Sequence, residues 1–247
     1  MSKRHRASGH TAVMQDRASA AVIDEIEDPV TRLHMALEFF PTPPWATRAL
    51  MKYVIPDAGG TAWDPCCGEG HMAEVLEEYF DAVYASDVHD HGCGAVGSFV
   101  GAGLDVIPSP PVAPHWLICN PPFSLALDFT KRALDEATDG VAVLVRLAWL
   151  ETQTRFDELF RRTPPSIVAQ FVERVPMTLG RWEPDAGTAT PYAWCVWHAD
   201  DVARGDSDTR FRWIPPGQRR ALTRPDDAAR FAKPARGDDQ PMLFELF

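Results

Sequence analysis

The stretch ICNPPFS, residues 118–124, places an asparagine, two prolines and a phenylalanine directly after an apolar run. Each proline fixes its own φ and biases the preceding residue toward an extended backbone, which makes Asn120, Pro121 and Pro122 a rigid corner. The Oδ1 atom of Asn120 and the carbonyl of Pro121 are two acceptors that can hold both N–H groups of an exocyclic amine and leave its lone pair facing an electrophile. Phe123 offers a flat face on which a nucleobase can stack. An ordinary loop turn with a core phenylalanine is the alternative interpretation.

A second candidate site lies earlier in the chain, in the stretch DPCCGEGHMA. Gly68 and Gly70 permit a tight turn and a close backbone approach to a bound nucleotide, and Asp64 places a carboxylate at the tip of the preceding strand. Asp87, 23 residues after Asp64, is positioned to bind both hydroxyls of a ribose. Because Gly68, Gly70 and Ala73 also satisfy the G-x-G-x-x-A fingerprint, this element alone does not distinguish NAD from S-adenosylmethionine.

Alternating strands and helices are expected to position these residues. Short apolar segments bounded by turns predict strands, and apolar residues at helical spacing predict helices between them. This order is typical of an α/β fold with a mainly parallel sheet and helices on both faces, where ligands bind at the carboxyl ends of the strands. Strands are expected at 61–65, 81–87, 116–119, 141–147, 166–175 and 192–198, and helices at 45–54, 70–80, 124–137 and 151–161.

The composition limits the class of protein. The 247 residues are 45% hydrophobic and 24% charged, which suffices for one large α/β domain with appendages. The basic N-terminus lacks the apolar segment of a signal peptide, and the longest apolar run is far shorter than a membrane span, so we expect a cytoplasmic protein. Five cysteines, an odd number, favour reduced thiols over a disulfide framework. We expect a mobile N-terminal tail over 1–30, a catalytic domain over 31–200, an Arg/Pro-rich C-terminal extension over 201–239 and a terminal peptide over 240–247.

Charge is unevenly distributed along the chain. The formal net charge is −11, but residues 204–236 hold nine basic residues against four acidic ones. A polyanion such as nucleic acid would therefore bind a local basic surface. A solvated arginine-rich surface without a partner is the alternative.

The chain resembles class I S-adenosylmethionine-dependent amino-methyltransferases. The resemblance rests on FFPTPP, DPCCGEG and NPPF, whose order is that of the gamma-type DNA adenine-N6 methyltransferases. It covers residues 39 to about 198, and small phage or prophage enzymes are the members that the chain is most similar to. The resemblance implies a Rossmann-like fold with a mainly parallel seven-stranded sheet, S-adenosylmethionine as cofactor and duplex DNA as partner. It also implies transfer of a methyl group to the amine of a flipped adenine.

The same resemblance implies roles for individual residues. The four residues of the NPPF corner would act in catalysis. The loop over residues 174–194 would face the target base, although a hydrophobic lid or a core strand is an equal alternative for its members. Cofactor binding is implied for Phe40, Thr42 and Pro43 at the methionine end, and for Asp64, Gly68 and Gly70 with the adjoining Cys66 at the amino-acid part. It is also implied for Asp87 at the ribose and for Asp105 at the adenine. Contacts with the target base are implied for Trp182, Thr190 and Tyr192.

The resemblance leaves other substrates open. Only 50 residues follow Trp197, fewer than a separate recognition domain usually has, so RNA or single-stranded DNA stays a candidate substrate. Protein-glutamine methyltransferases use the same Asn-Pro-Pro corner but usually carry Tyr where Phe123 stands. A catalytically dead scaffold that binds nucleic acid or a clamp is the remaining alternative, and the intact Asn120, Phe123 and glycine pair argue against it.

Two further stretches carry weaker signals. QPMLF, Gln240–Phe244, resembles short peptides that dock on bacterial sliding clamps, and the alternative is that its apolar residues pack back onto the sheet. HDHGC holds His89, His91 and Cys93 at alternate positions, which could bind zinc. No second ligand pair accompanies them, so no metal is expected.

Overall fold

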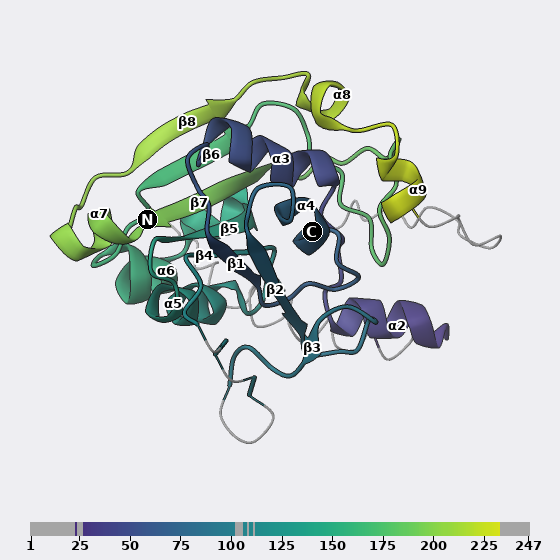
Figure 1. Ribbon diagram of the computed structural model, residues 1–247, viewed down its shortest axis with the longest axis horizontal. Coiled ribbons are helices and arrows are strands. Elements are labelled where there is room, and N and C mark those ends of the chain that lie inside the picture. The colour runs from purple at the N-terminus through teal and green to yellow at the C-terminus, as the bar shows by residue number, and fades with distance from the viewer. Residues whose placement is uncertain (1–22, 24–26, 102–105, 108, 111, 233–247) are drawn as a thin grey trace, which may run out of the picture.

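One eight-stranded sheet forms the centre of the protein (Figure 1). The computed structural model describes residues 23, 27–101, 106, 107, 109, 110 and 112–232. The strand order is β3-β2-β1-β4-β5-β7-β6-β8, and only β7 runs antiparallel to its neighbours. The strands are β1 (Thr61–Asp64), β2 (Ala82–Asp87), β3 (Ala95–Val96), β4 (Trp116–Cys119), β5 (Gly140–Arg146), β6 (Ile167–Phe171), β7 (Tyr192–His198) and β8 (Arg210–Ile214).

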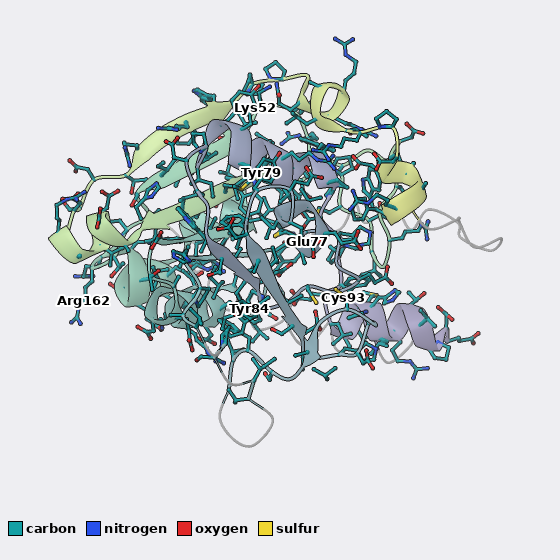
Figure 2. All side chains as sticks on the ribbon, in the orientation of Figure 1. Lys52, Glu77, Tyr79, Tyr84, Cys93 and Arg162 are labelled. Carbon is teal, nitrogen blue, oxygen red and sulfur yellow. The ribbon has the colours of Figure 1, made fainter. Side chains whose placement is uncertain are left out.

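Helices cover both faces of the sheet. On one face, Leu50 of α3 (Pro44–Tyr53) is buried in the same apolar cluster as Leu144 of β5. On the other, Phe129 of α5 (Ala126–Glu136) is buried with Val143, because successive residues of a strand point to opposite faces. Side chains fill the space between sheet and helices, whereas Arg162 extends outward (Figure 2). The remaining helices are α2 (Pro29–Ala36), α4 (Ala73–Leu76), α6 (Gln153–Arg155), α7 (Ala199–Arg204), α8 (Gln218–Leu222) and α9 (Asp227–Phe231), with a 3-10 helix η1 (Leu147–Glu151) and a π-helix η2 (Phe156–Phe160).

The expected α/β fold with a mainly parallel sheet is confirmed, with eight strands instead of seven. The two edge strands, β3 and β8, have no sequence signal. β3 has only two residues, both exposed, and the first four residues of β8 are exposed, so no apolar run marks either strand. The helix expected at 70–80 is reduced to the single turn of α4. The helix expected at 151–161 is divided among η1, α6 and η2, and the N–H of Arg161 bonds the Phe156 carbonyl five residues earlier.

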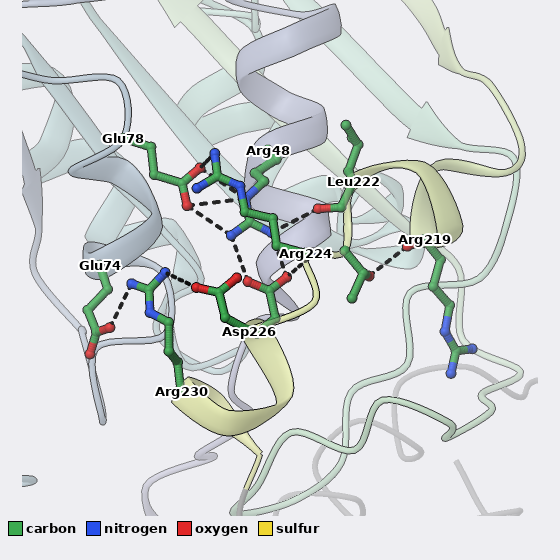
Figure 3. Close-up of polar contacts among 10 residues, drawn as sticks. Arg48, Glu74, Glu78, Arg219, Leu222, Arg224, Asp226 and Arg230 are labelled. Carbon is green, nitrogen blue, oxygen red and sulfur yellow. Dashed lines mark hydrogen bonds and ion pairs between the residues drawn. The ribbon is translucent and has the colours of Figure 1, made fainter.

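The described part of the expected C-terminal extension, residues 201–232, is packed into the same unit as the sheet. β8 pairs in parallel with β6, which makes it the eighth strand. The guanidinium of Arg48 in α3 donates to both carboxylate oxygens of Asp227 in α9, at 2.6 and 2.7 Å. It also bonds Glu78 at 2.8 Å, and Figure 3 shows Arg48 and Glu78 at the centre of this network. Arg48 and Asp227 are both buried. Their hydrogen bonds join α9, near the end of the described chain, to α3.

Most arginines of the basic C-terminal segment have intramolecular partners. Arg224 pairs with Glu78 at 2.7 Å and Arg230 with Glu74 at 3.0 Å (Figure 3). Acidic side chains or main-chain carbonyls also hold Arg204, Arg210, Arg212 and Arg219. These arginines connect parts of the fold, so the described segment offers less uncommitted positive charge than its sequence indicates.

Three of the sequence-based predictions lie outside the described residues. They concern most of the N-terminal tail, Asp105, and the terminal peptide Gln240–Phe244. None of the helices described is both long and apolar enough to cross a membrane.

Candidate functional site

Most of the predicted site residues lie at the point where the strand order of the sheet reverses. From β1 the chain passes to β2 on one side and returns to β4 on the other, so the carboxyl ends of β1 and β4 diverge into a ligand-binding position. Asp64 ends β1, and Asn120 directly follows β4. A cavity at this edge is lined by residues of all three predicted motifs, including Phe40, Thr42, Asp64, Cys66, Asp87, Asn120 and Pro122. The same cavity is lined by apolar side chains that the sequence interpretation missed, among them Phe39, Met72, Phe99 and Phe129.

The side chain of Asn120 is held in one orientation. Its Nδ2 atom donates a hydrogen bond of 2.9 Å to the carbonyl of Phe40, which lies 80 residues earlier in the chain. Its Oδ1 atom is buried and has no hydrogen-bond partner among the described residues. A buried acceptor without a partner costs about 1 to 3 kcal/mol, and it marks a position that a ligand or water satisfies. Asn120 therefore presents one fixed, unused acceptor at the end of β4.

The FFPTPP segment is fastened to the NPPF corner at a second point. Glu38 has a left-handed backbone with a φ of 49°, which is uncommon for a residue other than glycine. Its carboxylate accepts a hydrogen bond of 3.1 Å from the backbone N–H of Ser124. Thr42 is buried. Pro43 is the N-cap of α3 and Pro44 is its first residue. Proline is favoured at the first helical position, because a backbone N–H there would have no partner within the helix. A segment distant in sequence thus forms one wall of the site.

The glycine-rich turn after β1 is held by Asp87. Gly68 donates its backbone N–H to Oδ2 of Asp87 at 2.9 Å, and His89 donates its backbone N–H to Oδ1 at 3.0 Å. Gly68 has a φ of 52°, and a Cβ atom there would lie 2.4 Å from Cε2 of Phe39. Glycine fits this position because the left-handed backbone and the close aromatic ring both exclude a side chain. Asp87 therefore shapes the loop as well as lining the cavity.

An arginine covers the ring of Phe123. The guanidinium carbon of Arg146, the last residue of β5, lies 3.8 Å from the ring centroid. Phe40 and Tyr192 are tilted against the same ring, at 5.5 and 6.4 Å between centroids. The sequence interpretation missed Arg146, although a basic residue that ends a buried strand at the ligand-binding edge is the signal that marks it.

Comparison with solved structures identifies the architecture. The methyltransferase subunit of a type I restriction-modification system from Streptococcus thermophilus has a TM-score of 0.51 and 13% sequence identity, over 82% of this chain and 55% of that subunit. The chain has a Rossmann-like methyltransferase fold. It spans about half the length of the Streptococcus subunit.

Other comparisons with this methyltransferase fold are more distant. A protein from Listeria monocytogenes, described as a candidate class I S-adenosylmethionine-dependent methyltransferase, has a TM-score of 0.48 and 12% identity, over 87% of this chain and 74% of that one. No protein-family model matches the chain. The comparison with curated protein sequences gives no match.

Asp64 is the most buried acid of the cavity in this methyltransferase fold. Only 1% of the residue is exposed, and burial raises the pKa of its carboxyl to about 8. The backbone N–H of Cys66 opposes the rise in pKa, and the negative charge of Asp87 adds to it. A bound cation would favour the ionised carboxyl. Two acids in an aromatic-lined cavity therefore fit a ligand that carries positive charge and hydroxyl groups, as S-adenosylmethionine does.

The cysteines of the glycine-rich turn support the loop through their thiols. The Sγ atom of Cys66 donates to the carbonyl of Asn120 at 3.4 Å, which joins the turn to the NPPF corner. Burial raises the pKa of the Cys66 thiol, so the group stays neutral and keeps its donor. The Sγ atom of Cys67 donates to the carbonyl of Cys93 at 3.2 Å. Within the part of the chain that the structure covers, no three His, Cys, Asp or Glu side chains are arranged to hold a metal ion, and His91 instead stacks on Phe39 at 4.6 Å.

The three residues expected at the target base have different surroundings. Tyr192 begins β7 and lies beside Phe123. Trp182 is 3% exposed and packs in a separate cluster with Val75 and Phe231, which leaves little of its surface for a base. This packing corresponds to the core alternative, and we do not assign Trp182 to the substrate. Thr190 is half-buried, and its backbone N–H bonds the side chain of Thr188 at 3.2 Å.

Proposed function

We propose that the protein is an S-adenosylmethionine-dependent methyltransferase that acts on the exocyclic amine of adenine in DNA. The observation that carries this proposal is the Oδ1 atom of Asn120, which is buried, without a partner among the described residues and held in place by the Phe40 carbonyl. Asn120 lines the same cavity as Asp64 and Asp87. An unused acceptor beside an acidic, aromatic-lined cavity is what amine methylation needs.

The residues of the NPPF corner would bind and orient the amine. Asn120 Oδ1 accepts one N–H and the Pro121 carbonyl accepts the other, which draws the nitrogen toward tetrahedral geometry and exposes its lone pair. The turn is rigid because Leu125 donates its N–H to the Pro122 carbonyl at 3.0 Å. A dedicated base is not needed, since an amine becomes strongly acidic as its nitrogen is alkylated. Positioning therefore supplies most of the acceleration.

The cavity residues would hold the cofactor against that amine. S-Adenosylmethionine supplies a methyl group on a positively charged sulfur, which leaves the methyl carbon open to attack. Asp64 offers a carboxylate to the positive charge, and Asp87 lies at the end of β2, where an acid can bind ribose hydroxyls. The close backbone at Gly68 would face the amino-acid part, and Phe40 with Thr42 would line the methionine end.

The corner and the fold together support DNA as the substrate. An aromatic residue after Asn-Pro-Pro offers a stacking face to a base. The Streptococcus protein with this fold is the methyltransferase subunit of a restriction-modification system, which supports DNA as the substrate. An adenine in duplex DNA has to be flipped out of the stack to reach Asn120.

The direct test is transfer of a labelled methyl group from S-adenosylmethionine to separate pools of duplex DNA, single-stranded DNA, RNA and cell protein. Nucleosides and peptides from each pool are then identified by mass spectrometry. We expect N6-methyladenine from the duplex DNA pool. Label confined to RNA or to protein glutamine would move the assignment to that substrate, and no label in any pool would overturn the proposed activity.

Asn120→Ala tests the residue that carries the proposal. Loss of a preorganised acceptor is expected to reduce methyl transfer by about 100-fold or more, while the cofactor affinity measured by calorimetry stays within a few-fold of wild type. Ser124→Ala is the matched control, because Ser124 is exposed beside the corner and contributes its backbone N–H to Glu38. Equal activity of Asn120→Ala and wild type would contradict the proposed role.

A further inference from the structure

Arg146 occupies one face of the Phe123 ring, on which a base could otherwise stack. Its guanidinium carbon lies 3.8 Å from the ring centroid, which is the separation of stacked planar groups. The rings of Phe40 and Tyr192 are tilted against Phe123 by 37° and 43°, so the guanidinium is the flat group in face contact. A purine that stacks on this face therefore competes with Arg146.

The guanidinium of Arg146 is only partly paired. Tyr192 lies directly opposite in the antiparallel pairing of β5 and β7, and the positive charge of Arg146 opposes the rise in the pKa of the Tyr192 hydroxyl that burial causes. The Nε atom of Arg146 is buried and has no partner among the described residues. Arg132 differs, because it stacks on Phe99 but also pairs with Glu136 at 3.2 Å. Arg146 thus retains a donor for an anion at the carboxyl end of β5.

The site is acidic, so binding of a nucleotide phosphate there would require a positively charged side chain. Asp64 and Asp87 line the adjoining cavity, and the chain as a whole carries a formal net charge of −11. This charge would repel the phosphates of a nucleotide that enters the site. A guanidinium binds phosphate through several donors in one plane, and its flexible stem allows the head group to move between two positions.

Resting on the proposed function, we propose that Arg146 is a positioning residue for the target nucleotide. It covers Phe123 while the site is empty of substrate, and it moves aside when a base arrives and binds the phosphate of the same nucleotide. The base thus takes the place of the guanidinium on the ring, and the cation is retained within the site.

The experiment compares the full chain with Arg146→Ala in two binding measurements, both with S-adenosylhomocysteine present to fill the cofactor cavity. The first probe is adenosine, which has a base but no phosphate. Because it no longer displaces a cation–π contact, adenosine is expected to bind Arg146→Ala about 3- to 30-fold more tightly. The second probe is a single-stranded oligodeoxyadenylate, titrated over a range of salt concentrations. The slope of log affinity against log salt is expected to fall by about 0.7, the value for one lost phosphate contact on a single strand.

Two further variants separate the stacking from the charge. Arg146→Lys keeps the charge but loses the planar group, so it should retain the salt slope of wild type. Its adenosine affinity should lie between those of wild type and Arg146→Ala, because an ammonium still makes a cation–π contact but does not stack. Arg161→Ala is the matched control, since Arg161 stacks on Phe156 and pairs with Asp157 at an exposed position. It should leave adenosine affinity unchanged.

The outcomes distinguish this inference from the proposed function. Suppose that the wild-type protein methylates nucleic acid. Unchanged adenosine affinity or an unchanged salt slope in Arg146→Ala would then overturn only the role of Arg146. Failure of the wild type to bind S-adenosylhomocysteine or to methylate any nucleic acid would overturn the proposed function, and the inference with it.

Discussion

At the scale of single residues, the proposed chemistry depends on two buried polar groups, the Oδ1 atom of Asn120 and the carboxyl of Asp64. The Asn120 amide has one satisfied end and one unsatisfied end, which fixes the direction of its free acceptor. Burial raises the pKa of the Asp64 carboxyl to about 8. Both residues carry a cost in folding free energy that a bound ligand would relieve.

Asp64→Asn is expected to change how stability depends on pH. The pKa of Asp64 is about 8 in the folded protein, above its ordinary value of about 3.8, so the folded state binds the proton more strongly. The stabilisation from this proton is complete below about pH 4 and is lost as the pH rises through 8, at about 1.4 kcal/mol per pH unit between those values. The asparagine side chain has no proton to lose in this range, so the variant should gain stability relative to wild type as the pH rises from about 5 to about 8.

Urea unfolding at several pH values, without cofactor, measures this difference. Asp81→Asn, at an exposed position, is the control and should show no comparable trend. A stability difference between Asp64→Asn and wild type that stays constant with pH would show that the Asp64 carboxyl does not titrate in this range.

At the scale of the element, the turn after β1 depends on a backbone conformation. Gly68 has a left-handed φ, donates to Asp87 and lies against the ring of Phe39. The turn therefore connects the tips of β1 and β2 with the FFPTPP segment. A change at Gly68 should affect both stability and cofactor binding.

Gly68→Ala is expected to reduce the free energy of unfolding by about 2 kcal/mol, through the left-handed backbone and the contact with Phe39. Adding Phe39→Ala should remove the steric part but not the backbone part, so the two changes should be non-additive in thermal and urea unfolding. Gly187→Ala is the control, because a Cβ atom there would meet no other atom within 4 Å and its backbone is not left-handed. Equal effects of the two glycine substitutions would contradict the steric explanation.

At the scale of the whole molecule, a buried ion pair holds α9 against α3. Burial alone would lower the pKa of Arg48, but its hydrogen bonds to Asp227 and Glu78 raise it, so the arginine stays charged. Its bonds to Asp227 connect positions 179 residues apart. The described C-terminal segment is thus part of the folded unit and not an independent appendage.

Asp227→Asn removes one partner from this buried pair and is expected to reduce the free energy of unfolding by about 3 kcal/mol at neutral pH. Hydrogen bonding to Arg48 lowers the pKa of Asp227 against the opposing effect of burial, so its contribution persists above about pH 4 and is lost only at lower pH. Guanidinium chloride unfolding measures the change. Asp157→Asn, which breaks an exposed pair with Arg161, should cost less than about 1 kcal/mol. A small effect of Asp227→Asn would mean that Glu78 alone satisfies Arg48.

The elements with strong local sequence patterns could be predicted from the sequence. Buried runs such as VAVLV predict strands, and β1, β2, β4, β5, β6 and β7 all lie within or within one residue of predicted segments. The turn chemistry of the two motifs also predicted that Asp64 lies at the tip of one strand and that Asn120 follows another. The structure pairs these two strands, β1 and β4. These features can be read locally, because the spacing of apolar residues and the turn preferences of proline and glycine each depend on only a few neighbouring residues.

The contacts between residues distant in the sequence could not be predicted in this way and are seen only in the folded chain. The Phe40 carbonyl that orients Asn120, the guanidinium that covers Phe123 and the Asp227 partner of Arg48 come from separate parts of the chain. The exposed strand β8 likewise lacks an apolar pattern and is defined by pairing with β6. Such contacts form between side chains brought together by the path of the chain, and no local periodicity encodes that path.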